Sequence, residues 1–192
     1  FRGEKCNIVN CSMIGHEVSI GVYRTVYVNV ANCITDDKYF LNIMNSSQKR
    51  DIKVSNSKIT VKGPLVDWSG LNHTLTDVNF YNNTINYELS TGNNALLGSS
   101  EDNVAGFHSC DFNFKKAYPS SITAGISIFT KGRFSGCQFK SNIDNGLYNA
   151  VLQITNKVQD EQVFTNCKFW NVEVRPHYAE TGLKSYKIKG CT

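Results

Sequence analysis

The chain has 192 residues, of which 41% are hydrophobic, and its 20 basic and 16 acidic residues give a net charge of +4. This length and composition suit one domain with a packed core, which we place at residues 1–192. No apolar run is long enough to span a bilayer, so membrane insertion is not expected. The basic residues are scattered rather than gathered into a continuous stripe, so nucleic-acid binding is not expected either.

A six-residue phrase recurs eight times along the chain: an apolar residue, any residue, a turn-prone residue, a small residue, any residue, and an apolar residue. A repeat of this period is typical of solenoids. The phrases begin at Ile8, Val30, Val54, Leu75, Phe107, Phe134, Phe164 and Ile188. Their fourth positions are Cys11, Cys33, Ser57, Val78, Cys110, Cys137, Cys167 and Cys191.

Each phrase predicts two short strands that meet at a sharp bend. The third position holds Asn, Asp, Ser or Gly, which tolerate a left-handed backbone or close a turn by local hydrogen bonds. The first, fourth and sixth positions are expected to point inward, and the mostly polar fifth position outward. A further apolar stretch precedes several phrases and predicts a third strand, at residues 39–43, 95–97, 125–129 and 150–154.

Three short strands per repeat indicate a parallel β-helix, in which equivalent residues stack roughly 4.8 Å apart. We therefore expect Cys110, Cys137, Cys167 and Cys191 in one column, with the rings of Phe112, Phe139 and Phe169 stacked beside it. The column cysteines are expected to be reduced, because parallel Cβ vectors hold the sulfurs away from the dihedral of a disulfide. Cys6 lies off this column, and the sequence leaves its redox state open.

The phrases resemble the coil of the right-handed parallel β-helix superfamily, which includes pectate-lyase-like enzymes and bacteriophage tailspikes. The resemblance covers nearly the whole chain and implies an all-β, right-handed, single-stranded parallel β-helix of about eight coils. It also implies a homotrimer and a location at a virion surface or outside the cell. Because the last phrase is incomplete at Thr192, we expect the chain to be a segment of a longer protein.

Two outward rows carry the residues that suggest a function. One row is predicted to hold Asp36, Thr60, Tyr81, Asn113, Lys140 and Trp170, and the other Asn79, Asp111, Gln138 and Lys168. Polar groups interleaved with aromatic rings suit a cell-surface polysaccharide, whose hydroxyls need hydrogen bonds and whose ring faces stack on aromatics. The predicted carbohydrate-binding residues are Tyr81, Asn113, Gln138, Lys140, Lys168 and Trp170.

Two alternatives to binding remain open: cleavage of the glycan by a glycoside hydrolase or polysaccharide lyase, and a passive structural shaft. Hydrolysis requires two carboxylates in one groove, and the weak candidates are Asp111, Asp144 and Glu173. Asp144 and Glu173 could meet from loops of successive coils. For a lyase, residues 175–177 match only part of the pectate-lyase motif. No cofactor is expected, and no metal site either, because no zinc-like spacing of Cys and His occurs.

Overall fold

The computed structural model describes residues 3–46, 49–73, 76–89, 94–98, 103–116, 125–128, 131–142, 150–154, 163–176 and 187–192. Regular structure in these ranges consists of strands β1 to β22. Within the same ranges, no helix long and apolar enough to cross a membrane is present.

Sheet A has eight parallel strands and sheets B and C have seven each. Sheet A contains β1 (Lys5–Val9), β4 (Tyr27–Ala31), β7 (Arg50–Ser55), β10 (Thr76–Tyr81), β13 (Val104–His108), β16 (Lys131–Ser135), β19 (Val163–Thr165) and β22 (Lys187–Lys189). Sheet B contains β2 (Ser12–Ile14), β5 (Ile34–Asp37), β8 (Lys58–Val61), β11 (Thr84–Leu89), β14 (Asp111–Lys116), β17 (Gln138–Ser141) and β20 (Lys168–Trp170). Sheet C contains β3 (Val18–Val22), β6 (Tyr39–Ser46), β9 (Val66–His73), β12 (Asn94–Leu97), β15 (Gly125–Ile128), β18 (Ala150–Ile154) and β21 (Val172–Pro176).

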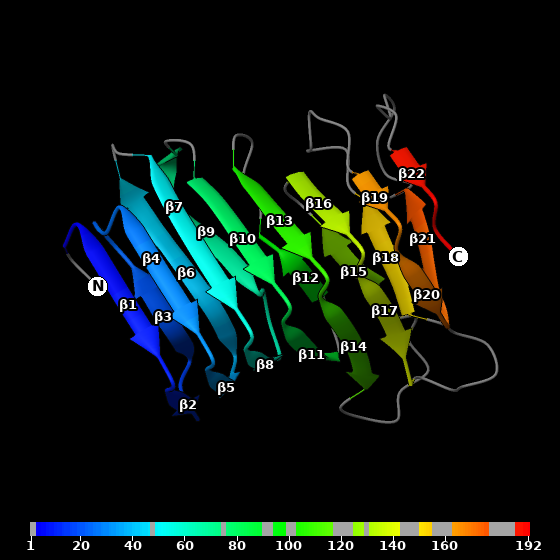
Figure 1. Cartoon of the computed structure of the whole chain (residues 1–192), viewed down its shortest axis with the longest axis horizontal. Helices are drawn as coiled ribbons and strands as arrows, with labels where there is room; N and C mark the ends of the chain where they lie inside the picture. Colours follow the sequence, from blue (N-terminus) through cyan, green and yellow to red (C-terminus); the bar gives the residue numbers. More distant parts are fainter. Residues whose placement is uncertain are drawn as a thin grey trace.

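Successive strands enter sheets A, B and C in turn, and each strand pairs with its equivalent from the next coil (Figure 1). The two ends of the described chain lie at opposite ends of the resulting rod. This arrangement confirms the predicted parallel β-helix and its third strand. The number of coils differs from the expected eight, because the described residues complete seven three-strand coils and only β22 belongs to the last phrase.

The bend between sheets A and B is formed by a residue in the left-handed conformation, as the third phrase position predicted. Its φ is 56° at Asn10, 54° at Asn32, 53° at Ser109, 63° at Gly136 and 52° at Asn166. Asn and Gly adopt this conformation at a lower cost than residues with bulky side chains. These residues therefore recur at the third phrase position because the bend requires a left-handed backbone conformation.

The fourth phrase was predicted in the wrong place. Asp77 lies inside the regular alternation of β10, while the bend occurs at Asn82, whose φ is 55°. The correct phrase runs over residues 80–85, so Asn83 replaces Val78 at the fourth position, 26 residues after Ser57. Asp77 is a turn-prone residue two positions after Leu75, but an acid on the outer side of a regular strand satisfies the same pattern.

The fourth-position side chains form hydrogen bonds with backbone groups of the neighbouring coils. Thiol sulfurs lie 3.4–3.6 Å from the first-position carbonyl of the preceding coil, at Cys33, Cys110, Cys137, Cys167 and Cys191. Asn83 Nδ2 donates to the equivalent carbonyl of Val54 at 3.0 Å, and its Oδ1 accepts from the Ser57 amide at 2.9 Å. The position therefore requires a small side chain that both donates and accepts, which Cys, Ser and Asn provide.

All seven cysteines are free, as predicted for the column. The cysteine column is continuous, because the Gln138 amide donates to Cys110 O, the Lys168 amide to Cys137 O, and the Cys167 amide to Cys191 Sγ. Hydrogen bonding to the thiols of Cys110 and Cys167, together with burial, raises the pKa of Cys137. That thiol therefore stays protonated at neutral pH.

Two columns of phenyl rings fill the C-terminal half of the core. In sheet A, the Phe107, Phe134 and Phe164 rings are stacked with centroids 4.9 Å apart. In sheet B, Phe112 stacks on Phe139 at 4.7 Å and Phe139 on Phe169 at 5.0 Å, which confirms the predicted stack. The columns meet edge to face, for example at 5.5 Å between Phe134 and Phe139. Both arrangements are favourable geometries for aromatic pairs.

Candidate functional site

The outer face of sheet B brings together five of the six predicted carbohydrate-binding residues. Asn113, Lys140 and Trp170 are register partners on β14, β17 and β20. Gln138 and Lys168 are register partners in the neighbouring row. We call these five outward residues the Trp170 face.

Lys140 and Trp170 interact directly on this face. Lys140 Nζ lies 5.0 Å from the centroid of the Trp170 ring, and Trp170 is 45% exposed. The side chains of Lys140 and Lys168 are also exposed. On β14, β17 and β20, the register rows that hold Lys140 and Lys168 contain one acid, Asp111. The Trp170 face therefore combines an accessible aromatic ring with an excess of positive charge.

Tyr81 does not belong to the Trp170 face, so its prediction as a member of that row is wrong. It ends β10 in sheet A, where its ring stacks on His108 at 4.9 Å and Lys53 Nζ lies 5.4 Å from its centroid. Asn79 lies on the same strand of sheet A. The misplaced fourth phrase caused both errors.

Thr84 and Asn86 occupy the sheet B positions that were assigned to Asn79 and Tyr81. Thr84 is the register partner of Asp111, and Asn86 of Asn113. The Asn113 amide donates to Asn86 Oδ1 at 3.3 Å. The polar row therefore continues without an aromatic ring at this coil.

The predicted acidic residues do not form a pair among the described residues. Asp111 lies on β14 in sheet B and Glu173 on β21 in sheet C, so the two occupy different faces of the rod. Asp144 lies outside the described residues. Asp51 and Asp77 are register partners in sheet A, but Asp77 forms an ion pair with Lys49 at 3.3 Å.

Asp67 is a half-buried carboxyl on β9, and burial raises its pKa above the ordinary value of 3.8. It lies in sheet C, away from both the Trp170 face and the Asp51–Asp77 pair. A raised pKa by itself gives an acid without a partner, so Asp67 does not supply the second carboxylate of a hydrolase. The raised pKa of Asp67 should instead make the stability of the folded protein depend on pH.

We expect the Asp67→Asn variant to melt at a higher temperature than the wild type at pH 7, with the difference vanishing near pH 3. The folded state favours the protonated carboxyl, so the contribution of Asp67 to the free energy of unfolding is fully present below its ordinary pKa. That contribution is lost as the pH rises through the raised folded value. Thermal melts followed by circular dichroism across this range measure the effect. A pH-independent difference between the two proteins would contradict it.

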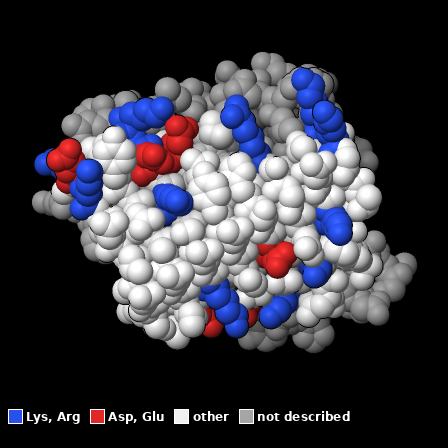
Figure 2. All heavy atoms as spheres, in the orientation of Figure 1, with Lys and Arg blue, Asp and Glu red and all other residues white. Residues whose placement is uncertain are grey.

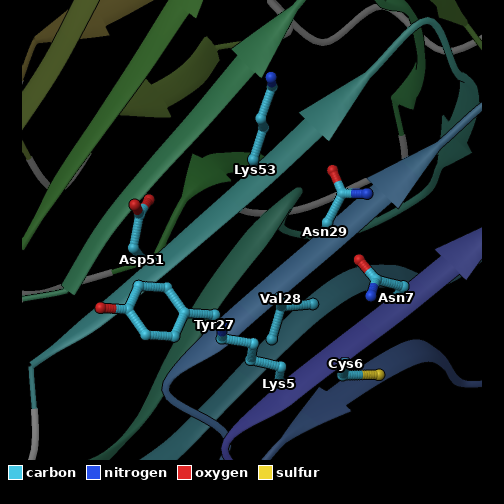
Figure 3. Close-up of a pocket in the computed structure, with 8 residues that line it drawn as sticks. All are labelled: Lys5, Cys6, Asn7, Tyr27, Val28, Asn29, Asp51 and Lys53. Atoms are coloured by element: carbon cyan, nitrogen blue, oxygen red, sulfur yellow. The ribbon is translucent and has the colours of Figure 1, made fainter.

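Sheet A carries a shallow hollow that the sequence did not indicate (Figure 3). Its volume is about 160 Å³, and it crosses β1, β4 and β7 near one end of the rod. The lining residues are Lys5, Cys6, Asn7, Tyr27, Val28, Asn29, Asp51 and Lys53. Tyr27 is the large exposed side chain of this group, at 49%. Strand alternation points the polar residues and Tyr27 outward, whereas Val28 is buried and Cys6 packs against the core. No recurring sequence pattern marks these residues as a group.

The charges of the same side of the rod are dispersed. Figure 2, in which β4, β7 and β10 lie toward the viewer, shows acidic and basic side chains around a broad area without charged groups. Within the described ranges, no cluster of three or more His, Cys, Asp or Glu side chains is arranged to hold a metal ion. Comparisons with family models, curated proteins and solved structures found no match for this chain.

Proposed function

We propose that this protein binds an acidic cell-surface polysaccharide through the Trp170 face. The observation that carries the proposal is the contact between Lys140 and the exposed Trp170 ring, at 5.0 Å. A sugar that carries a carboxylate can place its apolar ring face against the indole while its charge lies near a lysine. The Trp170 face can therefore contact both the apolar ring face and the carboxylate of an acidic sugar.

The neighbouring side chains fit a polymer better than a single sugar. Gln138 and Asn113 supply amide donors and acceptors for hydroxyl groups, and Lys168 adds a second cation. Register partners on adjacent parallel strands repeat at roughly 4.8 Å, so these groups recur along the rod axis. A polysaccharide that runs along the axis would meet one set of groups on each coil.

The resemblance to the right-handed β-helix superfamily supplies the biological context of the proposal. Tailspike-like proteins and surface adhesins of this architecture place such faces on the outside of a virion or a cell. On this view the protein belongs to the pectate-lyase-like superfamily, acts as a homotrimer in host recognition, and is located on a virion surface or outside the cell. The repeat and the sheet topology support the architecture alone.

Affinity electrophoresis in gels that contain hyaluronan, alginate or polygalacturonate tests the binding. We expect at least one of these acidic polymers to retard the wild type, and added NaCl to weaken the retardation because it screens exposed lysines. The Trp170→Ala and Lys140→Ala variants should each lose about tenfold in affinity. Lys189→Ala, which removes an exposed lysine on sheet A, is the matched control and should bind normally.

Two other results would redirect the proposal. Binding that survives the loss of Trp170 would remove the Trp170 face as the site, and the absence of any retardation would favour a passive shaft. Release of reducing ends or unsaturated uronates during incubation would identify an enzyme. In that case product formation should be compared between the wild type and the Asp111→Asn and Glu173→Gln variants.

A further inference from the structure

We infer that the hollow on sheet A is a second glycan-binding site, which takes an uncharged sugar unit of a polysaccharide. It lies on a different sheet from the Trp170 face and shares no residue with it. The inference therefore stands independently of the function proposed above. Its basis is the combination of an exposed ring, paired amides, and one cation and one anion beside the ring.

The ring is that of Tyr27, which is 49% exposed at the start of β4. Figure 3 shows this ring face-on beside Asp51, with Lys5 on the neighbouring strand. Lys5 Nζ lies 5.9 Å from its centroid, while no aromatic side chain among the described residues stacks on it. Tyr81 has its ring stacked on His108, so Tyr27 is the better platform for the apolar face of a sugar.

The amides are those of Asn7 and Asn29, which are register partners on β1 and β4. Neither side chain forms a hydrogen bond with another of the described residues, so each keeps two donors and one acceptor oxygen for a ligand. Figure 3 shows both amides on the same side of the sheet, with Lys53 on the adjacent strand. Such a pair can bracket the adjacent hydroxyls of one sugar ring.

The charge of the hollow favours an uncharged sugar. Tyr27 lies between Lys5 and Asp51 in one register row, so its ring has one cation and one anion as neighbours. An acidic sugar stacked on this ring would meet the Asp51 carboxylate, whereas the register partner of Trp170 is Lys140. Asp51 and the lysines instead provide an acceptor and donors for hydroxyl groups.

The size of the hollow points to one unit of a polymer and not to an isolated ligand. Its volume of about 160 Å³ lies below the about 300–1,000 Å³ of pockets that enclose drug-sized ligands. Polar side chains also continue beyond it, because Asn29, Lys53 and Asn79 occupy one register row on β4, β7 and β10. A polysaccharide that runs along the rod would place one unit against Tyr27 and contact this row with the next ones.

Affinity electrophoresis with neutral dextran, galactomannan and xyloglucan tests the site in the full chain. At least one of these polymers should retard the wild type. Exposed charges are already screened at about 0.1 M salt, and binding of a neutral polymer does not depend on them, so about 0.5 M NaCl should leave the retardation unchanged. The Tyr27→Ala variant should lose about tenfold or more in affinity. Tyr27→Phe keeps the stacking ring and should stay within about threefold of the wild type.

The controls separate this site from the Trp170 face and from misfolding. Asn29→Ala should weaken binding of the neutral polymer, whereas Trp170→Ala should leave it unchanged, and circular dichroism melts verify that each variant is folded. Retardation of folded Tyr27→Ala equal to that of the wild type would overturn the inference, as would the failure of every neutral polymer to retard the wild type. Loss of neutral binding in Trp170→Ala would assign it to the other face and overturn it too.

Discussion

Replacement of Phe134 by alanine is expected to lower the free energy of unfolding by about 3–5 kcal/mol. The Phe134 ring is almost completely buried and stacks between Phe107 and Phe164, with both centroids 4.9 Å away. It also meets the Phe112 and Phe139 rings edge to face. Its removal leaves a cavity that the regular coil spacing cannot close, because the strands above and below are fixed by ladder hydrogen bonds. Urea denaturation measures the loss.

Phe134→Leu is the matched control for this experiment. It keeps most of the apolar volume but loses the flat stacking surface, so the loss should be clearly smaller than for alanine. Ile188→Ala, which shortens an apolar side chain that is 48% exposed, should change stability little. Equal losses for the alanine and leucine variants at position 134 would show that the ring column is not what stabilises this part of the core.

Replacement of Asn83 by valine is expected to cost about 2–4 kcal/mol, although valine is similar in size and more apolar. Asn83 is 2% exposed, and its amide is bonded to Val54 O and to the Ser57 amide. Each buried backbone group that loses its partner costs about 1–3 kcal/mol. Urea denaturation at constant pH provides the measurement, and an unchanged dependence on denaturant concentration would show that the folded state remains compact.

Asn83→Cys tests whether the fourth position requires a polar function or only a volume. In other coils a cysteine reaches the equivalent carbonyl, as Cys137 does with Phe107 O at 3.4 Å. The Cys191 sulfur also accepts from the Cys167 amide at 3.4 Å. The cysteine variant should therefore be more stable than the valine variant. If the two variants unfold at the same urea concentration, hydrogen bonding does not determine which residue types are tolerated at the fourth position.

Phe134 and Asn83 affect the proposed glycan binding indirectly, because they help to keep the rod rigid. The Trp170 face takes its residues from three coils, and the sheet A hollow takes its residues from another three. Ring stacking and fourth-position hydrogen bonds fix the distance and register between coils. A destabilised core should therefore weaken glycan binding only when the variant is close to its unfolding transition, which separates this effect from that of Trp170→Ala or Tyr27→Ala.

The sequence predicted the Trp170 face in part, because alternation within one strand fixes which residues point outward. Lys140 and Trp170 could be aligned from the phrases around Cys137 and Cys167, and the structure places them in register. Tyr81 could not be aligned correctly, since Asp77 and Asn82 each lie two residues after an apolar residue, Leu75 and Phe80, and both residue types favour turns. Only the left-handed φ of Asn82 distinguishes the bend.

The sequence by itself determined that this chain winds into a parallel β-helix, because an Asn or Gly bend flanked by inward apolar residues repeats often enough to fix the coil. It also determined the cysteine column and the phenylalanine stack, which follow from equal positions in successive phrases. Only the tertiary structure decided that Tyr81 and Trp170 belong to different sheets, and that Tyr27, Asn7 and Asn29 form one hollow. Those juxtapositions depend on register between coils separated by loops of unequal length, and no local pattern encodes that register.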